Sequence, residues 1–343
     1  MFNVNDDYSK LKVCAVGSVF LPEYFDYVND SQIKDSIQKL MIETEEDLRT
    51  LITLLQSFGV EIIRPLLPEE ECRLIKPMIT PRDHMLMLGS SFYIDKKNKS
   101  RQMAPMINLL RDNGNDVIID KEIRSSFLIS DGTMMLWSTD SDSMVSLNDL
   151  TEVEFNRLAN ITARNKEKQE LSQKRNLFSL ANHQMSGIIG PLKGKISILG
   201  PKLLSVVNDD AYIRLCQKWF KDFDMIIVED QESYIISYNE LCKKNGMRWW
   251  IKGSEYAHSM TDFIRFYMKH WIGMPGITTY GNEILMIDES NAVTVGLDST
   301  TVDALSKRGI KTHIVEFRHR FFWNCGILRL TSDLDRQSRL PLP

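Results

Sequence analysis

Cysteine is scarce in this chain and follows no disulfide or metal-binding pattern. Five cysteines are scattered over 343 residues, and no two of them form a CxxC pair. An odd and scattered set argues against a disulfide framework and against a zinc site, and it favours a reducing compartment. The histidines have no metal-ligand spacing either. We therefore expect a cytoplasmic protein that holds no metal ion.

The chain also lacks a long apolar run and a strong excess of one charge. No stretch approaches the roughly 20 apolar residues that span a bilayer. The N-terminus has no basic segment followed by an apolar one, so we expect no secretory signal. A net charge of −4 and a pI near 5.9 provide no basic surface for nucleic acid or for an anionic membrane. Neither is expected among the partners.

What remains is the composition of a soluble globular protein. Hydrophobic residues make up 43% and charged residues 26% of the chain, which is ordinary for this class. The length allows two ordinary domains or one large repetitive one. No flexible segment rich in Pro, Gly or Ser divides the chain. We therefore predict a single domain over residues 1–343.

A recurring pattern organises this domain: an amphipathic helix, a glycine and a short apolar strand. Earlier strands precede some of these helices, so the unit reads strand, strand, helix, strand. Any α/β protein contains several helix–glycine–strand units, so the pattern alone leaves open whether the repeat is structural. Residues of about 205–270 are rich in Trp, Tyr and Lys, and we interpret them as extra helices inserted late in the chain. The pattern occurs at 48–64, 109–119, 241–250 and 305–315, and more loosely at 219–228.

Two residues at the start of a strand are candidates for substrate binding. Arg82 and Asp83 lie between a loop and the apolar segment 84–89. A carboxylate at a strand edge can hold a guanidinium or an ammonium by charge-assisted hydrogen bonds. An aspartate beside a loop is also ordinary, and Arg82 could be its structural partner instead.

Three further residues are candidates for catalysis. Asp131 follows the apolar segment 127–130 and precedes a glycine, so it is either a turn residue or a carboxylate that orients a histidine. His183 is of the type that moves protons near neutral pH, although a lone histidine is often structural. Cys325 is either a small buried apolar residue or a nucleophile, and the second role needs a nearby histidine or cation that lowers its pKa.

The order and spacing of these sites resemble the amidinotransferase family of the pentein superfamily. Residues 80–89 match its M-P-R-D-x-x-x-x-x-G signature, and residues 127–131 match F-x-x-x-D. His183 lies 52 residues after Asp131, as the family histidine lies about 50 residues after its aspartate, and it begins a segment that ends at Gly194. Residues 284–333 match almost without gaps. The resemblance covers nearly the whole chain apart from the region of about 205–270.

This resemblance implies an α/β fold, a five-bladed αβ propeller of ββαβ repeats, here with a helical insertion late in the chain. It also implies an enzyme. In the family, a cysteine thiolate attacks the guanidino carbon of arginine, and a histidine protonates the leaving amine and later activates the acceptor amine. An aspartate fixes the histidine and the guanidinium. The partners would be small guanidino and amine substrates, without a metal or organic cofactor, and a homodimer stays open.

Two positions depart from the family. Its chain ends in H-C-x-T-x-D-x-x-R, and here the nucleophile position is Arg329, whose guanidinium has no lone pair for attack. The family's H-x-D reads His183-Gln184-Met185, so one carboxylate is missing, which weakens cation binding by roughly a few kcal/mol in a desolvated site. The residues that do fall on the terminal pattern are Gly326, Thr331, Asp333 and Arg336.

Three hypotheses follow. In the first, which the retained aspartate and histidine favour slightly, a shifted loop makes Cys325 the nucleophile of an amidinotransferase, with Asp131 and His183 in their family roles. Alternatively, the covalent step is lost and the protein binds or regulates, with the guanidinium of Arg329 near Asp131 as a tethered substrate mimic. A third hypothesis keeps acid–base chemistry without a thiol. The catalytic candidates are thus Asp131, His183 and Cys325, and the substrate-binding candidates are Asp83, Arg82 and Arg329.

Overall fold

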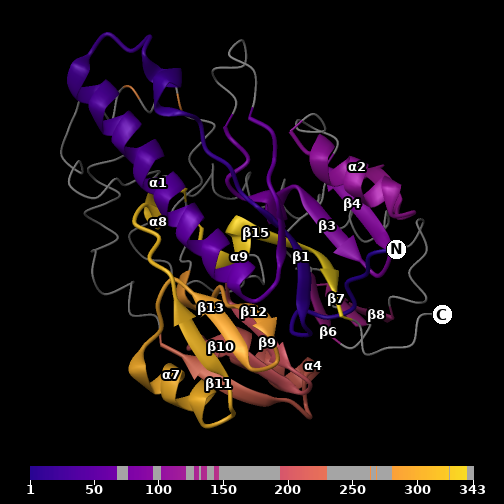
Figure 1. Ribbon diagram of the computed structural model, residues 1–343. Coiled ribbons are helices and arrows are strands. Elements are labelled where there is room, and N and C mark those ends of the chain that lie inside the picture. Colours follow the sequence, from indigo (N-terminus) through magenta and orange to yellow (C-terminus); the bar gives the residue numbers. More distant parts are fainter. Residues whose placement is uncertain are drawn as a thin grey trace, which may run out of the picture.

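A computed structural model describes residues 1–67, 76–95, 102–120, 127–130, 133–136, 143–146, 194–229, 263, 268, 280–323 and 325–337. These residues form a mixed α/β fold, and their strands are arranged in five three-stranded sheets (Figure 1). No helix in these ranges is long and apolar enough to cross a membrane.

Three sheets are built from one continuous unit of strand, strand, helix and strand. In each unit the middle strand pairs antiparallel with the first strand and parallel with the third. The helix supplies the crossover that a parallel pair requires. The unit expected from the sequence is therefore confirmed in these three sheets, and its expected occurrence at 241–250 lies outside the described residues. The three units are β3 (Met85–Leu88), β4 (Ser91–Asp95), α2 (Ala104–Asp112) and β5 (Asp116–Asp120); β9 (Ile196–Gly200), β10 (Leu203–Val207), α4 (Asp210–Trp219) and β11 (Asp224–Val228); and β12 (Leu285–Asp288), β13 (Asn291–Thr294), α7 (Ser299–Ser306) and β14 (Lys311–Ile314).

A fourth sheet has the same topology but takes its strands from both ends of the chain. Its middle strand β1 (Leu11–Val16) pairs parallel with β2 (Glu61–Ile63) after the crossover helix α1 (Ser31–Ser57). Its antiparallel partner is β15 (Thr331–Arg336), the last strand of the chain. The fifth sheet contains β6 (Phe127–Ser130), β7 (Thr133–Leu136) and β8 (Ser143–Ser146), all antiparallel.

The backbone conformation explains why a glycine recurs after these helices. Gly59, Gly114 and Gly309 follow α1, α2 and α7 with φ between 77° and 79°. This left-handed conformation ends a helix and suits a residue without a Cβ. Each glycine N–H donates to a carbonyl in the last turn of its helix. The glycine therefore stops the helix and directs the chain into the parallel strand.

One expectation about the domain is wrong. Residues 203–228 form β10, α4 and β11 of a regular unit, so the proposed insertion does not begin at about 205. The composition was misleading because α4 is an ordinary amphipathic helix, which buries Tyr212 and Cys216 and exposes Lys218. Most of residues 229–270 lies outside the described part of the chain, so additional helices there stay a prediction.

The segment after β14 carries the residues of interest. It passes through α8 (Arg320–Trp323) and α9 (Ile327–Leu330) before it enters β15. Figure 1 shows α8 alongside α1, and Trp323 of α8 bonds to Thr44 of α1. The one-turn helix α9 also contacts β13 and the 3-10 helix η3 (Pro81–Asp83). Two segments that lie far apart in the sequence, η3 and α9, therefore meet.

Candidate functional site

Asp83 and Arg329 form a two-point ion pair where η3 meets α9. The Nε atom of Arg329 donates to Oδ1 of Asp83 over 3.1 Å, and its Nη2 atom donates to Oδ2 over 2.6 Å. Two parallel N–H···O bonds match the planar guanidinium to the carboxylate. Both side chains are 21% exposed, so the pair is partly accessible.

The charges of this pair stabilise each other. Burial alone would raise the pKa of Asp83, but the charge and the hydrogen bonds of Arg329 outweigh burial and hold this pKa well below its usual range. Burial alone would lower the pKa of Arg329, and Asp83 keeps it above its ordinary value instead. His84 and Lys76 add positive charge that also lowers the pKa of Asp83. Asp83 is therefore ionised and Arg329 is charged.

Glu283 is a site residue that the sequence analysis missed. It precedes β12 and is completely buried, and its Oε2 atom accepts from the backbone N–H groups of Gly326 (2.9 Å) and Arg329 (3.2 Å). Its Oε1 atom has no hydrogen-bond partner among the residues described. Burial raises the pKa of Glu283 to about 7, although the charge of Arg329 and the two N–H donors lower it. In the sequence, Glu283 could have been recognised as a candidate because it is a carboxylate at the start of the apolar segment 283–287.

Cys325 faces the core in this structure. Its side chain is fully buried, in the apolar cluster that also contains Phe322 and Trp323. Burial raises the pKa of the Cys325 thiol well above its ordinary value, and the nearby cations Arg329 and Lys76 only partly oppose this effect. The thiol is therefore protonated here and shielded from solvent.

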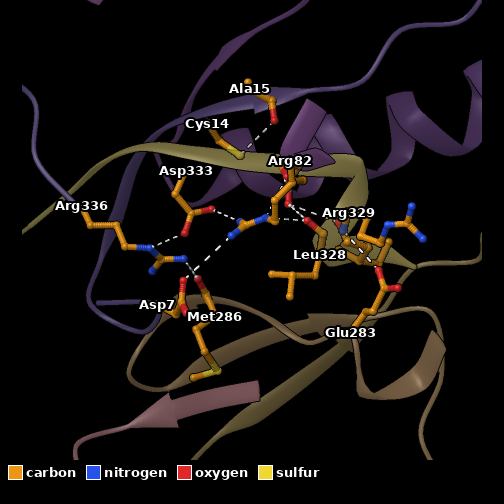
Figure 2. A network of polar contacts seen from close by, with 12 residues as sticks. Asp7, Cys14, Ala15, Arg82, Glu283, Met286, Leu328, Arg329, Asp333 and Arg336 are labelled. Atoms are coloured by element: carbon orange, nitrogen blue, oxygen red, sulfur yellow. Dashed lines mark hydrogen bonds and ion pairs between the residues drawn. The ribbon is translucent and has the colours of Figure 1, made fainter. Parts of the chain in front are cut away.

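Arg82, expected to bind substrate, belongs to a buried structural network instead. Its Nε atom donates to the carbonyl oxygens of Leu328 (2.8 Å) and Thr331 (3.0 Å), and its Nη2 atom donates to Asp333 (2.5 Å). Figure 2 shows Arg82 lying between Leu328 and Asp333. The alternative of an Arg82–Asp83 pair is also wrong, because Asp83 pairs with Arg329. Arg82 fixes η3 against the end of α9 and thereby orients Asp83.

Asp333 connects this network to the rest of the molecule. Its second oxygen accepts from Nε of Arg336 over 2.8 Å. Arg336 also donates to the carbonyl oxygen of Met286 in β12 over 2.8 Å (Figure 2) and to that of Ser9 near the N-terminus. The aspartate and the arginine of the terminal T-x-D-x-x-R pattern are therefore joined to the arginine of the P-R-D motif.

The other predicted site residues belong to parts of the chain that the structure does not describe. Asp131, His183, Gln184 and Met185 lie outside the described residues, as does the expected approach of Arg329 to Asp131. The strand before Asp131 is confirmed as β6. In the described ranges, no group of three or more His, Cys, Asp or Glu side chains is arranged to hold a metal ion. The geometry of the Asp83 carboxylate, whose two oxygens accept from one guanidinium, is suited to binding a guanidinium.

The whole chain resembles solved structures, although no protein-family model and no curated protein sequence matches it. One is inosamine-phosphate amidinotransferase StrB1 from Streptomyces griseus, with a TM-score of 0.58, 13% identity, and coverage of 99% of this chain and 98% of that one. This chain has the amidinotransferase fold. A second amidinotransferase, SxtG of the saxitoxin biosynthetic pathway in Microseira wollei, has a TM-score of 0.56 and 12% identity, with 99% of each chain covered. The resemblance found in the sequence is thus confirmed at the level of the fold.

Proposed function

We propose that this protein acts on guanidino compounds at the site around Asp83. One observation carries the proposal: the Asp83 carboxylate already holds a guanidinium, that of Arg329, through both of its oxygens. This fork-to-fork geometry selects a planar guanidinium over a compact ammonium. The amidinotransferase fold supports the same class of substrate. In this proposal the five sheets are the five blades of a propeller around the site.

The proposed reaction is transfer of an amidino group from arginine, or from a related guanidino compound, to an amine. Cys325 is the nucleophile, and its sulfur forms a bond to the guanidino carbon as the ornithine amine leaves. His183 protonates the leaving amine and then activates the acceptor, and Asp131 orients His183. Because the Cys325 thiol is buried and protonated in this structure, the reaction also requires the segment from α8 to α9 to expose it.

A second candidate is guanidino binding without a covalent step. Two observations favour it: Arg329 stands at the nucleophile position of the family pattern, and the Cys325 thiol is buried with a raised pKa. In this version the Asp83 carboxylate recognises the ligand and no amidino-cysteine forms. The homodimer and the cytoplasmic location expected from the sequence stay predictions under either version.

Intact-mass spectrometry after incubation with arginine tests the reaction. We expect a mass gain equal to one amidino group together with release of ornithine, and both should disappear in Cys325→Ser. Cys216→Ser is the matched control, because Cys216 is also buried, with a pKa raised to about 12, but lies in α4. A folded protein that forms no adduct and releases no ornithine contradicts amidino transfer. Arginine binding that is lost in Asp83→Asn would then support the second candidate.

A further inference from the structure

The guanidinium of Arg329 fills the position that a ligand guanidinium would take on Asp83. Each carboxylate oxygen of Asp83 accepts one N–H group of Arg329. A guanidino compound must therefore displace Arg329 before it can make the same two bonds. We propose that Arg329 is an intramolecular ligand that closes the site, and that Glu283 is the positioning residue that keeps it there. This inference rests on the proposed function, since both take Asp83 as the ligand-binding carboxylate.

The turn that carries Arg329 is held at its beginning by Glu283. A single helical turn such as α9 is unstable by itself, because nucleation of a helix is unfavourable. The Glu283 carboxyl accepts from the N–H of Gly326, which precedes α9, and from the N–H of Arg329 within it. Figure 2 shows Glu283 directed at this backbone. Glu283 therefore determines where the Arg329 side chain starts.

The end of the same turn is held by two other residues. Thr331 donates its hydroxyl to the carbonyl oxygens of Ile327 and Leu328, and Arg82 donates to Leu328 as well. Because the backbone is tied on both sides, Arg329 is directed at Asp83 before any ligand arrives. This preorganisation makes the internal ion pair an effective competitor, since little ordering entropy remains to be lost.

The chemistry of the pair also defines which ligand can compete. Exchange of Arg329 for a ligand guanidinium replaces one planar cation by another, so Asp83 keeps both hydrogen bonds and its countercharge. An alkylammonium presents its N–H groups on a single nitrogen and cannot reproduce the fork. Among the described residues, Glu283, Lys76 and Cys325 are further titratable groups near Arg329. The competing class is therefore guanidinium or amidinium compounds.

Calorimetric titration of the full-length protein with arginine tests this inference. We expect Arg329→Ala to bind arginine at least ten-fold more tightly than the native protein, and we expect Asp83→Asn in the same background to abolish the gain. Methylamine should not compete with arginine. Arg308→Ala is the matched control, because it removes another arginine–aspartate pair, with Asp224, on a different sheet; its affinity for arginine should be native.

The outcomes separate this inference from the proposed function. If the native protein and Arg329→Ala bind arginine equally, and Asp83→Asn weakens both, the internal ligand is disproved and the proposed function stands. If arginine binding is the same with and without the Asp83 carboxylate, or if the folded Arg329→Ala variant binds no guanidinium, the proposed function fails as well.

Glu283 requires a readout that a purely structural role would not change. Glu283→Gln keeps an oxygen that can accept from both N–H groups, so arginine affinity should stay native. Glu283→Ala removes that acceptor, so its affinity should rise towards that of Arg329→Ala. Glu283→Asp, a milder change, should lie between the two and serves if the alanine variant does not fold. If Glu283→Ala and Glu283→Asp fold and neither binds arginine more tightly than the native protein, Glu283 does not position Arg329.

Discussion

At the scale of single residues, one partly buried and two buried carboxyl groups show how the partner determines the charge. Asp83 faces a guanidinium through both oxygens, so its pKa falls in spite of burial. Asp333 lies between two guanidinium groups. Glu283 receives two backbone N–H groups and leaves one oxygen unused, so burial prevails and its pKa rises. The site therefore combines an ionised and a readily protonated carboxyl group.

The raised pKa of Glu283 predicts a pH-dependent stability. Its pKa rises from 4.5 to about 7 on folding, so the folded protein holds a proton that the unfolded chain loses above pH 4.5. The associated stability is fully present below pH 4.5 and is lost as the pH rises through 7, by about 3 kcal/mol. Glutamine does not titrate. We would measure the unfolding free energies of the native protein and of Glu283→Gln in urea from pH 4 to 8. As the pH rises, the native protein should lose stability relative to the variant.

Glu45 provides a control of opposite sign. Arg64 and Arg49 overcome its burial and lower its pKa, so its stabilising effect is present above its ordinary pKa and is lost as the pH falls. As the pH rises, the unfolding free energy of the native protein should therefore increase relative to that of Glu45→Gln. A Glu283→Gln difference that stays constant over this range would rule out a proton held by buried Glu283.

At the scale of elements, α1 positions the segment that leads to the site. Asp47 accepts from both the backbone N–H and the Nε of Arg318, at 2.8 Å each. One turn earlier, Thr44 accepts the indole N–H of Trp323 over 2.9 Å. These contacts attach residues 318–323 to one face of the helix, as Figure 1 shows for α8. The path into α9 is therefore set by a helix near the other end of the chain.

Replacement of Thr44 by valine tests this attachment. Valine has a similar shape, but it leaves the buried indole N–H of Trp323 without this acceptor, which should lower the unfolding free energy by about 1–3 kcal/mol. Thr53→Val is a matched control, because both threonines also donate to the carbonyl four residues earlier in α1 and Thr53 is exposed. Denaturant unfolding compares the two. Equal and small changes would show that the indole contact contributes little.

At the scale of the whole molecule, the two ends of the chain close one sheet. The last strand, β15, pairs with β1, and Asp333 in β15 joins the guanidinium groups of Arg82 and Arg336. Through these arginines the network reaches η3, β12 and the N-terminal segment. Removal of one carboxylate therefore affects several sheets at once.

Asp333→Asn should be strongly destabilising. It leaves two buried guanidinium groups without their shared charge partner, which costs about 3–5 kcal/mol when one partner of a buried pair is removed. Asp335→Asn is the control on the same strand, since asparagine keeps the oxygen that accepts from the N–H of Asn3; a change below about 1 kcal/mol is expected there. Thermal and denaturant unfolding measure both. Similar losses for the two variants would contradict a central role for the Asp333 network.

The sequence by itself indicated the repeating unit and marked Asp83 as a candidate for binding a cation. Both follow from local causes: the apolar period defines helix or strand, the glycine needs a left-handed backbone after the helix, and a carboxylate beside a strand suits a cationic partner. The order of the motifs was also enough to recognise the amidinotransferase fold. None of these features requires knowledge of which distant residues meet.

Only the tertiary structure decided which groups meet and which are buried. Asp83 receives the guanidinium of a residue 246 positions away, Arg82 is directed into the network of Asp333, and the Cys325 thiol lies in the core. Glu283 is a site residue because its carboxyl group accepts the backbone N–H groups of Gly326 and Arg329, which are 43 and 46 positions away. Desolvation and pairing over such separations depend on how the sheets pack. That packing, which local sequence patterns do not encode, makes Arg329 the partner of Asp83.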